Sequence, residues 1–205
     1  SKQNGGTASA YNAGVAQVDT PYVAICSADD ILDKEWNSAF KSMISEHPEY
    51  SIYCSNGWYL FHDSKQVKDV YSSSYWGQER ELSLREVVRR CFFSVGTVYR
   101  REMFDELGGY RIGVYGEDYD LWLRAMVNGA KVFYSPRRLA FHRISSFQKT
   151  NDAQKVMLSA YEVIDYSLRR PHILPEVKKE IVQGLRLRKI DSIIEKLINR
   201  IRRIL

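Results

Sequence analysis

The order of apolar and polar positions along the chain predicts helices that alternate with short, buried strands. Residues 7–18 carry apolar side chains at helical spacing, and residues 22–26 form a continuous apolar run of the kind found in buried strands. A second helix with one apolar face is expected over 36–44, and a second strand over 51–54. This alternation predicts an α/β fold with a mainly parallel sheet and flanking helices.

The alternation resumes after a middle stretch, residues 56–77, that is aromatic and polar without a clean period. Two further helices are expected over 82–92 and 116–127, the second opened by a glycine and closed by Asn-Gly. Strands are expected over 95–99 and 131–134.

The character of the chain changes after about residue 150, where only helical patterns follow. We therefore divide it into an α/β domain over residues 1–150 and a helical C-terminal extension over residues 151–205. The end of the extension repeats apolar residues in steps of three and four: Leu187, Ile190, Ile194, Leu197, Ile201 and Ile204. Two interpretations of this basic amphipathic helix stay open. It packs on its own domain or on a partner helix, or residues 186–205 dock on an anionic membrane surface.

Charge and composition narrow the class of protein. The 205 residues are 44% hydrophobic and 27% charged, which is typical of a folded domain with an appendage. The net charge of +5 comes from residues 186–203, which hold seven basic and two acidic residues, so the rest of the chain is neutral and no nucleic-acid partner is expected. No apolar run reaches the roughly 18 residues of a membrane-spanning helix.

The cysteines indicate a reducing compartment. Cys26, Cys54 and Cys91 lie among apolar residues and form no Cys-x-x-Cys pair, so buried thiols in a cytoplasmic protein are expected. A peripheral position at the inner face of a membrane is the alternative that the basic helix suggests.

Two acidic pairs are the first candidates for chemistry. Asp29-Asp30 follows the predicted strand at 22–26, and ligands of open α/β sheets bind beyond the carboxyl ends of strands. Two carboxylates there suit Mg²⁺ or Mn²⁺, which prefer oxygen ligands and also bind phosphate. Glu117-Asp118 opens the helix over 116–127, where a carboxylate can act as a general base. The simpler interpretation of both pairs is a solvated turn and favourable acids at a helix N-terminus.

Two more pairs of residues complete the candidates. His142-Arg143 follows a Pro-Arg-Arg turn, and arginine suits phosphate oxygens whereas histidine can bind a metal. Asp120 and Arg124 have the spacing of an ordinary i,i+4 ion pair.

Three sequence motifs follow one another along the chain. They are residues 4–14 (NGGTASAYNAG), residues 21–32 (PYVAICSADDIL) and residues 108–124 (GGYRIGVYGEDYDLWLR), followed by Gly129 and Arg143. This series resembles family 2 glycosyltransferases of the GT-A fold over roughly residues 1–147. The resemblance implies a partial GT-A fold, which is Rossmann-like, followed by the helical extension.

The resemblance also implies an activity. Family 2 enzymes transfer a sugar from a nucleotide-diphosphate sugar, with inversion and with Mn²⁺ or Mg²⁺, to a glycan or lipid-linked acceptor. Carried over, Asp118 is the catalytic base with Glu117 beside it, and Asp30 and Asp29 hold the metal. The donor-binding residues that the resemblance implies are Asn4, Gly5, Asn12, Asp29, His142 and Arg143. The Gln-x-x-Arg-Trp motif of processive synthases is missing, which favours transfer of a single sugar.

The chain departs from the family pattern at three places. Ser27 stands where the first acid of the metal motif is usual, and Tyr11 stands where arginine is familiar before Asn12. The family's first strand and acidic nucleotide-binding loop are not in this sequence, so an N-terminally incomplete domain is expected. The alternative is a non-catalytic GT-A-like module that acts through a partner or a membrane surface.

Overall fold

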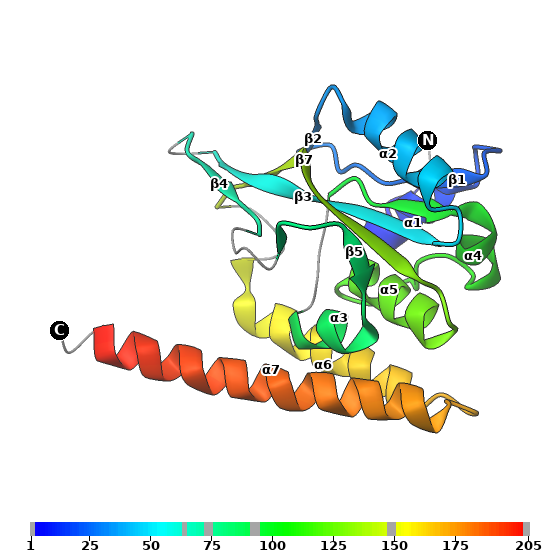
Figure 1. Ribbon diagram of the computed structural model, residues 1–205. Coiled ribbons are helices and arrows are strands. Elements are labelled where there is room, and N and C mark those ends of the chain that lie inside the picture. The colour runs from blue at the N-terminus through cyan, green and yellow to red at the C-terminus, as the bar shows by residue number, and fades with distance from the viewer. Residues whose placement is uncertain (1–2, 63–64, 72–75, 91–94, 147–150, 203–205) are drawn as a thin grey trace.

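The computed structural model describes residues 3–62, 65–71, 76–90, 95–146 and 151–202, of which residues 193–202 are described by their backbone alone. Figure 1 shows a twisted sheet with α2 on one face and α3, α5, α6 and α7 on the other. The helices are α1 (Gly6–Val15), α2 (Trp36–Glu46), α3 (Leu84–Arg90), α4 (Arg101–Glu106), α5 (Glu117–Val127), α6 (Ala153–Leu168) and α7 (Pro175–Arg202). The strands are β1 (Tyr22–Ala24), β2 (Ile31–Leu32), β3 (Ile52–Phe61), β4 (Val67–Asp69), β5 (Arg80–Leu82), β6 (Val98–Arg100) and β7 (Val132–Ile144).

The α/β class is confirmed, and the sheet is mixed. Its order is β1-β6-β3-β7-β2, and β4 and β5 pair with β3 and β7 beside this path. β3 and β7 pair in parallel, and β1 runs in their direction because β6 lies antiparallel between β1 and β3. The expectation of a mainly parallel sheet therefore holds for the three strands that helices connect. It is wrong for the short strands β2, β4, β5 and β6, which all pair antiparallel. Parallel pairs need crossover connections, whereas β4 simply folds back from β3 as a hairpin.

Alternation along β3 and β7 divides the core between the two faces of the sheet. Ile52 and Cys54 point to a large cluster that also contains residues of α3, α5, α6 and α7. Tyr53, between them, points to a smaller cluster with Phe133 of β7 and Phe40 of α2. Each fully buried apolar side chain of this size contributes about 1.5–3 kcal/mol to the free energy of unfolding.

The helical extension packs on the same core. Ile181 of α7 is fully buried, and Gly184 lies so close to α3 that an added Cβ would meet the Arg85 carbonyl oxygen at 2.7 Å. Arg89 of α3 also forms a two-pronged ion pair with Asp191, at 2.7 and 2.8 Å. The first part of α7 therefore packs on its own domain. Of the apolar seam expected over residues 187–204, Leu187 is half-buried and Ile190 is exposed, so what this seam contacts stays a prediction. Ile194, Leu197 and Ile201 have side chains outside the described set, and Ile204 lies outside the described residues.

The cysteine prediction is correct in one place and wrong in another. Cys54 is buried in β3, but Cys26 is exposed, because β1 ends at Ala24 and Cys26 belongs to the following loop. Cys91 lies outside the described residues. In the described part of the chain, no helix is long and apolar enough to cross a membrane.

Candidate active site

The turn that carries Asp29 and Asp30 is fixed against the end of β7. β2, which follows the turn, pairs with β7 at Ile31 and Phe141, and this pairing brings the turn to the next residues of β7. The Asp30 carboxylate oxygen Oδ1 lies 2.9 Å from Nδ1 of His142 and accepts a bond of 3.1 Å from the Arg143 amide. Arg143 Nε in turn donates to the Asp29 carbonyl at 2.9 Å. Asp29 and Asp30 thus form one cluster with His142 and Arg143, which lie more than 100 positions later in the chain.

This cluster leaves carboxylate oxygens of Asp29 and Asp30 available. The Asp30 side chain is only 5% exposed, and both of its hydrogen bonds go to Oδ1. Among the described residues, neither Oδ2 of Asp30 nor the exposed Asp29 carboxylate has a hydrogen bond to another side chain. The described residues hold no group of three or more acidic, histidine or cysteine side chains with metal-binding geometry. Two carboxylates nevertheless fit Mg²⁺ or Mn²⁺, which commonly take one or two protein oxygens and complete their shell with phosphate and water.

Tyr11 of α1 connects this cluster with the second acidic pair. Its hydroxyl lies 2.8 Å from the Ser27 hydroxyl, so the two residues that depart from the family pattern are bonded to each other. Burial raises the pKa of Tyr11, the Ser27 bond opposes this, and the negative charges of Glu117, Asp118 and Asp30 raise the pKa further. Asp30 of the first acidic pair and both members of the second therefore lie near enough to the Tyr11 hydroxyl for their charges to affect it.

The second acidic pair stands at the N-terminus of α5. Gly116, at φ +81°, has the left-handed conformation that glycine adopts most readily, and it lets the loop turn directly into the helix. Glu117 is 8% exposed and Asp118 is half-buried, with its Oδ1 accepting a bond of 2.8 Å from the Tyr119 amide. Acids are favoured in this first turn by the helix dipole.

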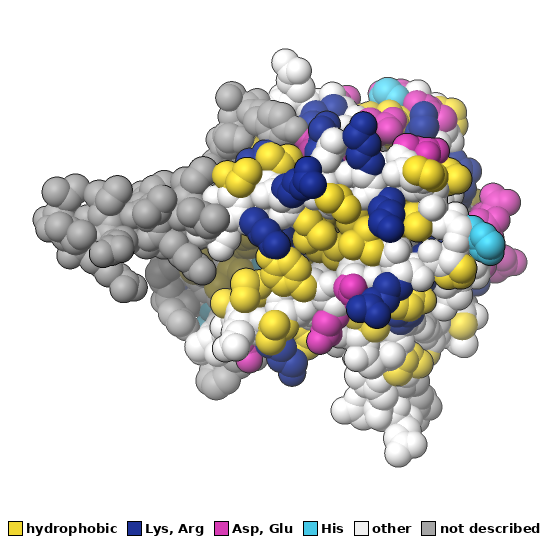
Figure 2. Space-filling model, turned by 90° about the horizontal axis from the view of Figure 1, so that it is seen from below, with side chains coloured by type: hydrophobic (Ala, Val, Ile, Leu, Met, Phe, Trp, Pro, Cys, Tyr) yellow, Lys and Arg dark blue, Asp and Glu magenta, His cyan; other side chains and the backbone are white. Residues whose placement is uncertain are grey.

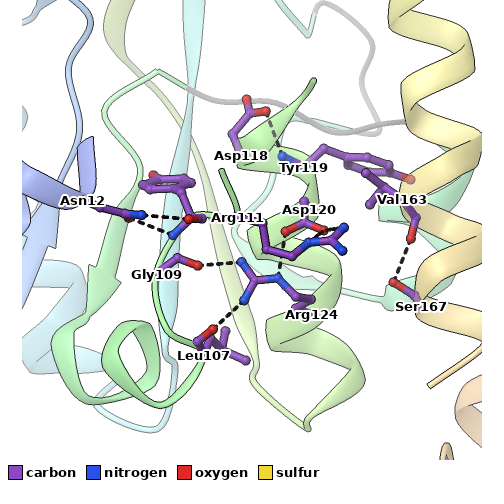
Figure 3. A network of polar contacts seen from close by, with 11 residues as sticks. Asn12, Leu107, Gly109, Arg111, Asp118, Tyr119, Asp120, Arg124, Val163 and Ser167 are labelled. Carbon is purple, nitrogen blue, oxygen red and sulfur yellow. Dashed lines mark hydrogen bonds and ion pairs between the residues drawn. The ribbon is translucent and has the colours of Figure 1, made fainter. Parts of the chain in front are cut away.

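The loop in front of α5 is held by a buried ionic network (Figure 3). Asp120 is completely buried; its Oδ2 accepts from Arg124 Nε at 2.7 Å, and its Oδ1 accepts from Arg111 Nε at 2.9 Å and also from Arg111 Nη2. Arg124 also donates to the Leu107 carbonyl at 2.8 Å and the Gly109 carbonyl at 2.6 Å. The Asp120–Arg124 ion pair expected from the sequence is confirmed. The contribution of Arg111 was missed, because a nine-residue separation across a loop follows no helical spacing.

Asn12 ties α1 to this loop. Its amide nitrogen donates to the Tyr110 carbonyl at 2.7 Å, and its oxygen accepts from the Tyr110 amide at 2.9 Å. Asn4 and Gly5 lie at the exposed start of α1, where the Asn4 side chain accepts from the Gly6 amide at 3.1 Å. In the described part of the chain, no hydrogen bond joins Asn4 or Gly5 to the turn of Asp29 and Asp30.

The fold is that of GT-A glycosyltransferases. The solved structure of Staphylococcus aureus TarS 1–349 with UDP-GlcNAc matches with a TM-score of 0.66 and 14% sequence identity, over 88% of this chain and 53% of that one. The mannosyltransferase PcManGT from Pyrobaculum calidifontis, in complex with GDP-Man and Mn²⁺, matches with a TM-score of 0.62 and 14% identity, over 90% of this chain and 50% of that one. This chain therefore spans about half the length of these structures.

The chain belongs to glycosyl transferase family 2, whose family model matches residues 1–108. A comparison with curated proteins finds no match. The matched range contains the turn of Asp29 and Asp30, whereas α5 with Asp118 follows it.

Proposed function

We propose that the protein transfers a single sugar from a nucleotide-diphosphate sugar to an acceptor hydroxyl, with inversion at the anomeric carbon. The observation that carries this proposal is a set of two acidic pairs, one in the turn before β2, where Asp30 contacts His142 and Arg143, and one at the start of α5. Tyr11 of α1 is bonded to Ser27 of that turn, and the charges of Asp30, Glu117 and Asp118 raise its pKa. One pair suits a metal-bound diphosphate, and the other suits a base on the far side of the sugar. The neighbours crystallised with UDP-GlcNAc and with GDP-Man support a nucleotide sugar as donor.

Asp30 and Asp29 are the proposed metal-binding residues. Oδ1 of Asp30 is occupied by His142 and Arg143, which orient the carboxylate so that Oδ2 is left for a cation. A bound Mn²⁺ or Mg²⁺ would neutralise charge on the departing diphosphate. The Mn²⁺ in the mannosyltransferase structure supports this assignment.

Asp118 is the proposed general base, with Glu117 beside it. Asp118 is half-buried and keeps Oδ1 on the Tyr119 amide, which fixes the carboxylate while it accepts the proton of an acceptor hydroxyl. The oxygen of that hydroxyl forms the new bond to the anomeric carbon while the bond to the diphosphate breaks. A single displacement of this kind inverts the configuration.

The remaining donor contacts are proposed in two groups. The guanidinium of Arg143 is placed by the Asp29 carbonyl, which suits a contact with a donor phosphate oxygen, and His142 lies beside it. Asn4 and Gly5 would contact the donor from the start of α1. Asn12 would act indirectly, through its hydrogen bonds to the backbone of Tyr110.

The test is a paired substitution in the intact protein. We expect Asp118→Asn to abolish sugar transfer while leaving the calorimetric affinity for the nucleotide diphosphate unchanged. Asp30→Ala should instead weaken Mn²⁺-dependent binding of UDP or GDP. Asp165→Asn, an exposed change on α6, is the matched control for a lost carboxylate. Turnover retained by Asp118→Asn would remove Asp118 as the base, and an unchanged Mn²⁺ titration of Asp30→Ala would remove the metal site.

The underside of the protein supports a second proposal, contact with an anionic membrane that carries a lipid-linked acceptor. Figure 2 shows apolar side chains among basic ones on this face. The exposed apolar residues of α6, α7 and the turn between them include Leu158, Tyr166, Leu174 and Ile190. Lys178, Lys179, Arg186 and Lys189 are exposed on α7. Such a mixture binds anionic bilayers through buried apolar area and charge.

Vesicle sedimentation tests the membrane proposal. The protein should sediment with phosphatidylserine-containing vesicles and not with neutral ones, and the pair Lys178→Glu and Lys179→Glu should weaken the binding. Equal sedimentation with both kinds of vesicle, or no sedimentation with either, would contradict the membrane proposal. Either result would favour the other proposed partner of α7, a second helix.

A further inference from the structure

Helix α6 covers the loop that leads into α5. The guanidinium carbon of Arg111 lies 3.6 Å from the centre of the Tyr166 ring, and Lys155 Nζ lies 4.7 Å from the centre of the Tyr115 ring. Between these contacts, a Cβ placed on Gly116 would lie 3.5 Å from the Ser159 hydroxyl. Two cation–π contacts therefore hold residues 111–116 from the side of the C-terminal extension, and Ser159 lies beside Gly116.

Arg111 connects Tyr166 of α6 with the first turn of α5. Its other contact is the buried Asp120 carboxylate, whose second oxygen is taken by Arg124. Tyr166, Arg111, Asp120 and Arg124 thus form a continuous chain of contacts that ends on the carbonyls of Leu107 and Gly109. The sticks of Figure 3 show Arg111 and Arg124 on either side of Asp120.

The ring of Tyr166 strengthens the ion pair that it covers. The side chain of Arg111 is 30% exposed, so water competes for its guanidinium, and an aromatic ring on one face excludes part of that water. Excluding water raises the attraction between Arg111 and Asp120, because the effective dielectric constant falls. Without the ring, Arg111 gains a solvated alternative and the loop gains freedom.

We infer that α6, acting through Tyr166 and Arg111, positions the Asp118 carboxylate for catalysis. Asp118 stands two residues before Asp120 in the same helical turn, so a shift of the Asp120 anchor moves it directly. Tyr166 and Arg111 are positioning residues that touch no reacting atom. The inference rests on the proposed function, since it needs Asp118 to be the base.

Tyr166→Ala tests the inference by removing the ring. We expect kcat to fall about tenfold, equivalent to ~1.4 kcal/mol in the barrier, with KM for donor and acceptor within about twofold. Tyr166→Phe keeps an aromatic face for the guanidinium and should retain a kcat near that of the unmodified protein. Arg111→Lys loses the two-pronged contact with Asp120 and should resemble Tyr166→Ala.

Tyr161→Ala is the matched control. Tyr161 also lies on α6 and also stacks on an arginine, but its partner is Arg188 of α7, at 5.3 Å. This variant removes the same kind of contact from the same helix, at its contact with α7 and not at the loop before α5. We expect its kcat to stay unchanged even if its thermal stability falls.

Amide hydrogen exchange provides a readout that does not depend on activity. The Tyr110 amide is bonded to Asn12 and the Asp120 amide to the Gly116 carbonyl, so both should exchange slowly. In Tyr166→Ala we expect both to exchange about tenfold faster, and in Tyr161→Ala we expect no change. Unchanged exchange in Tyr166→Ala, an unchanged kcat, or an equal loss of kcat in Tyr161→Ala would each overturn the inference. An unmodified protein without any transfer activity contradicts the proposed function instead, while the exchange rates still decide whether α6 holds this loop.

Discussion

Asp120→Asn replaces the most deeply buried carboxylate among the described residues by a neutral side chain of nearly the same shape. In the native protein Asp120 is fully buried, and it neutralises Arg124, which is 6% exposed, and Arg111, which is 30% exposed. The substitution leaves two guanidinium groups without their counter-ion. Removing one partner of a buried ion pair costs about 3–5 kcal/mol.

The structure places the expected loss near the lower end of that range. Arg111 can turn toward water, which offsets part of the cost, whereas Arg124 stays bound to the carbonyls of Leu107 and Gly109. We therefore expect the free energy of unfolding to fall by about 3 kcal/mol. With a urea dependence of about 2 kcal/mol per molar, the unfolding midpoint falls by about 1.5 M.

Urea unfolding followed by circular dichroism measures this loss, and the chain offers a matched control. Asp165 and Arg169 of α6 form the same i,i+4 pair at 2.6 Å, but their side chains are 56% and 78% exposed. Asp165→Asn should change stability by less than about 0.5 kcal/mol, since exposed pairs contribute little. A loss below about 1 kcal/mol in Asp120→Asn, or equal losses in both variants, would refute the reasoning from burial.

Three further changes probe other contacts of the fold. Gly184→Val should destabilise the protein by roughly 1–3 kcal/mol in thermal unfolding, despite better helix propensity, because its side chain meets α3; an unchanged melting temperature would show that α7 can shift. Gly109→Ala should lower the free energy of unfolding in urea by roughly 2 kcal/mol or more, since its φ is +70° and its Cβ would lie 2.6 Å from Asn12 Oδ1. Gly108 has the same φ but open space around it, so an equal loss in Gly108→Ala would show that backbone strain alone is the cause. The hydrogen bonds from Arg89 lower the pKa of Asp191 in the folded protein. The pair therefore stabilises the fold fully above a pH of about 3.9, the pKa of aspartate in the unfolded chain. This stabilisation is lost as the pH falls through the lower pKa that Asp191 has in the folded protein. Asp191→Asn should reduce stability at pH 7 and reduce its dependence on pH below 4, measured by thermal unfolding across pH, and an unaltered pH dependence would contradict this.

The sequence predicted those parts of the molecule that depend on local pattern. The helix at 36–44 follows from its apolar face, and the helix at 116–127 follows from its apolar face and from the glycines at its ends. They match α2 and α5 closely. The Asp120–Arg124 pair follows from helical spacing alone. The order of the motifs indicated one site, and the structure brings the turn of Asp29 and Asp30 into contact with His142 and Arg143. Their roles stay predictions.

Other features depend on tertiary contacts that have no local pattern. β3 extends to Phe61, well beyond the predicted strand, because it pairs with β7 through register shifts between Ser55 and Trp58 that break the alternation. Arg111 reaches Asp120 across a loop with Gly113 and Gly116 in positive φ, where no periodicity applies. The hold of Tyr166 on Arg111 joins residues from two separately predicted units, so only the folded chain reveals it.

The docking of α7 on α3 has a consequence for synthesis on the ribosome. Arg89 and Asp191 are 102 residues apart in the chain, and Val87 and Val88 beside Arg89 are fully buried in the folded protein. At translation rates of 5–20 residues per second, roughly 5 to 20 s pass between the synthesis of α3 and that of its cover. During this interval Val87 and Val88 lack the cover that α7 gives them, so the nascent chain exposes apolar surface of the kind that makes incomplete chains prone to aggregate.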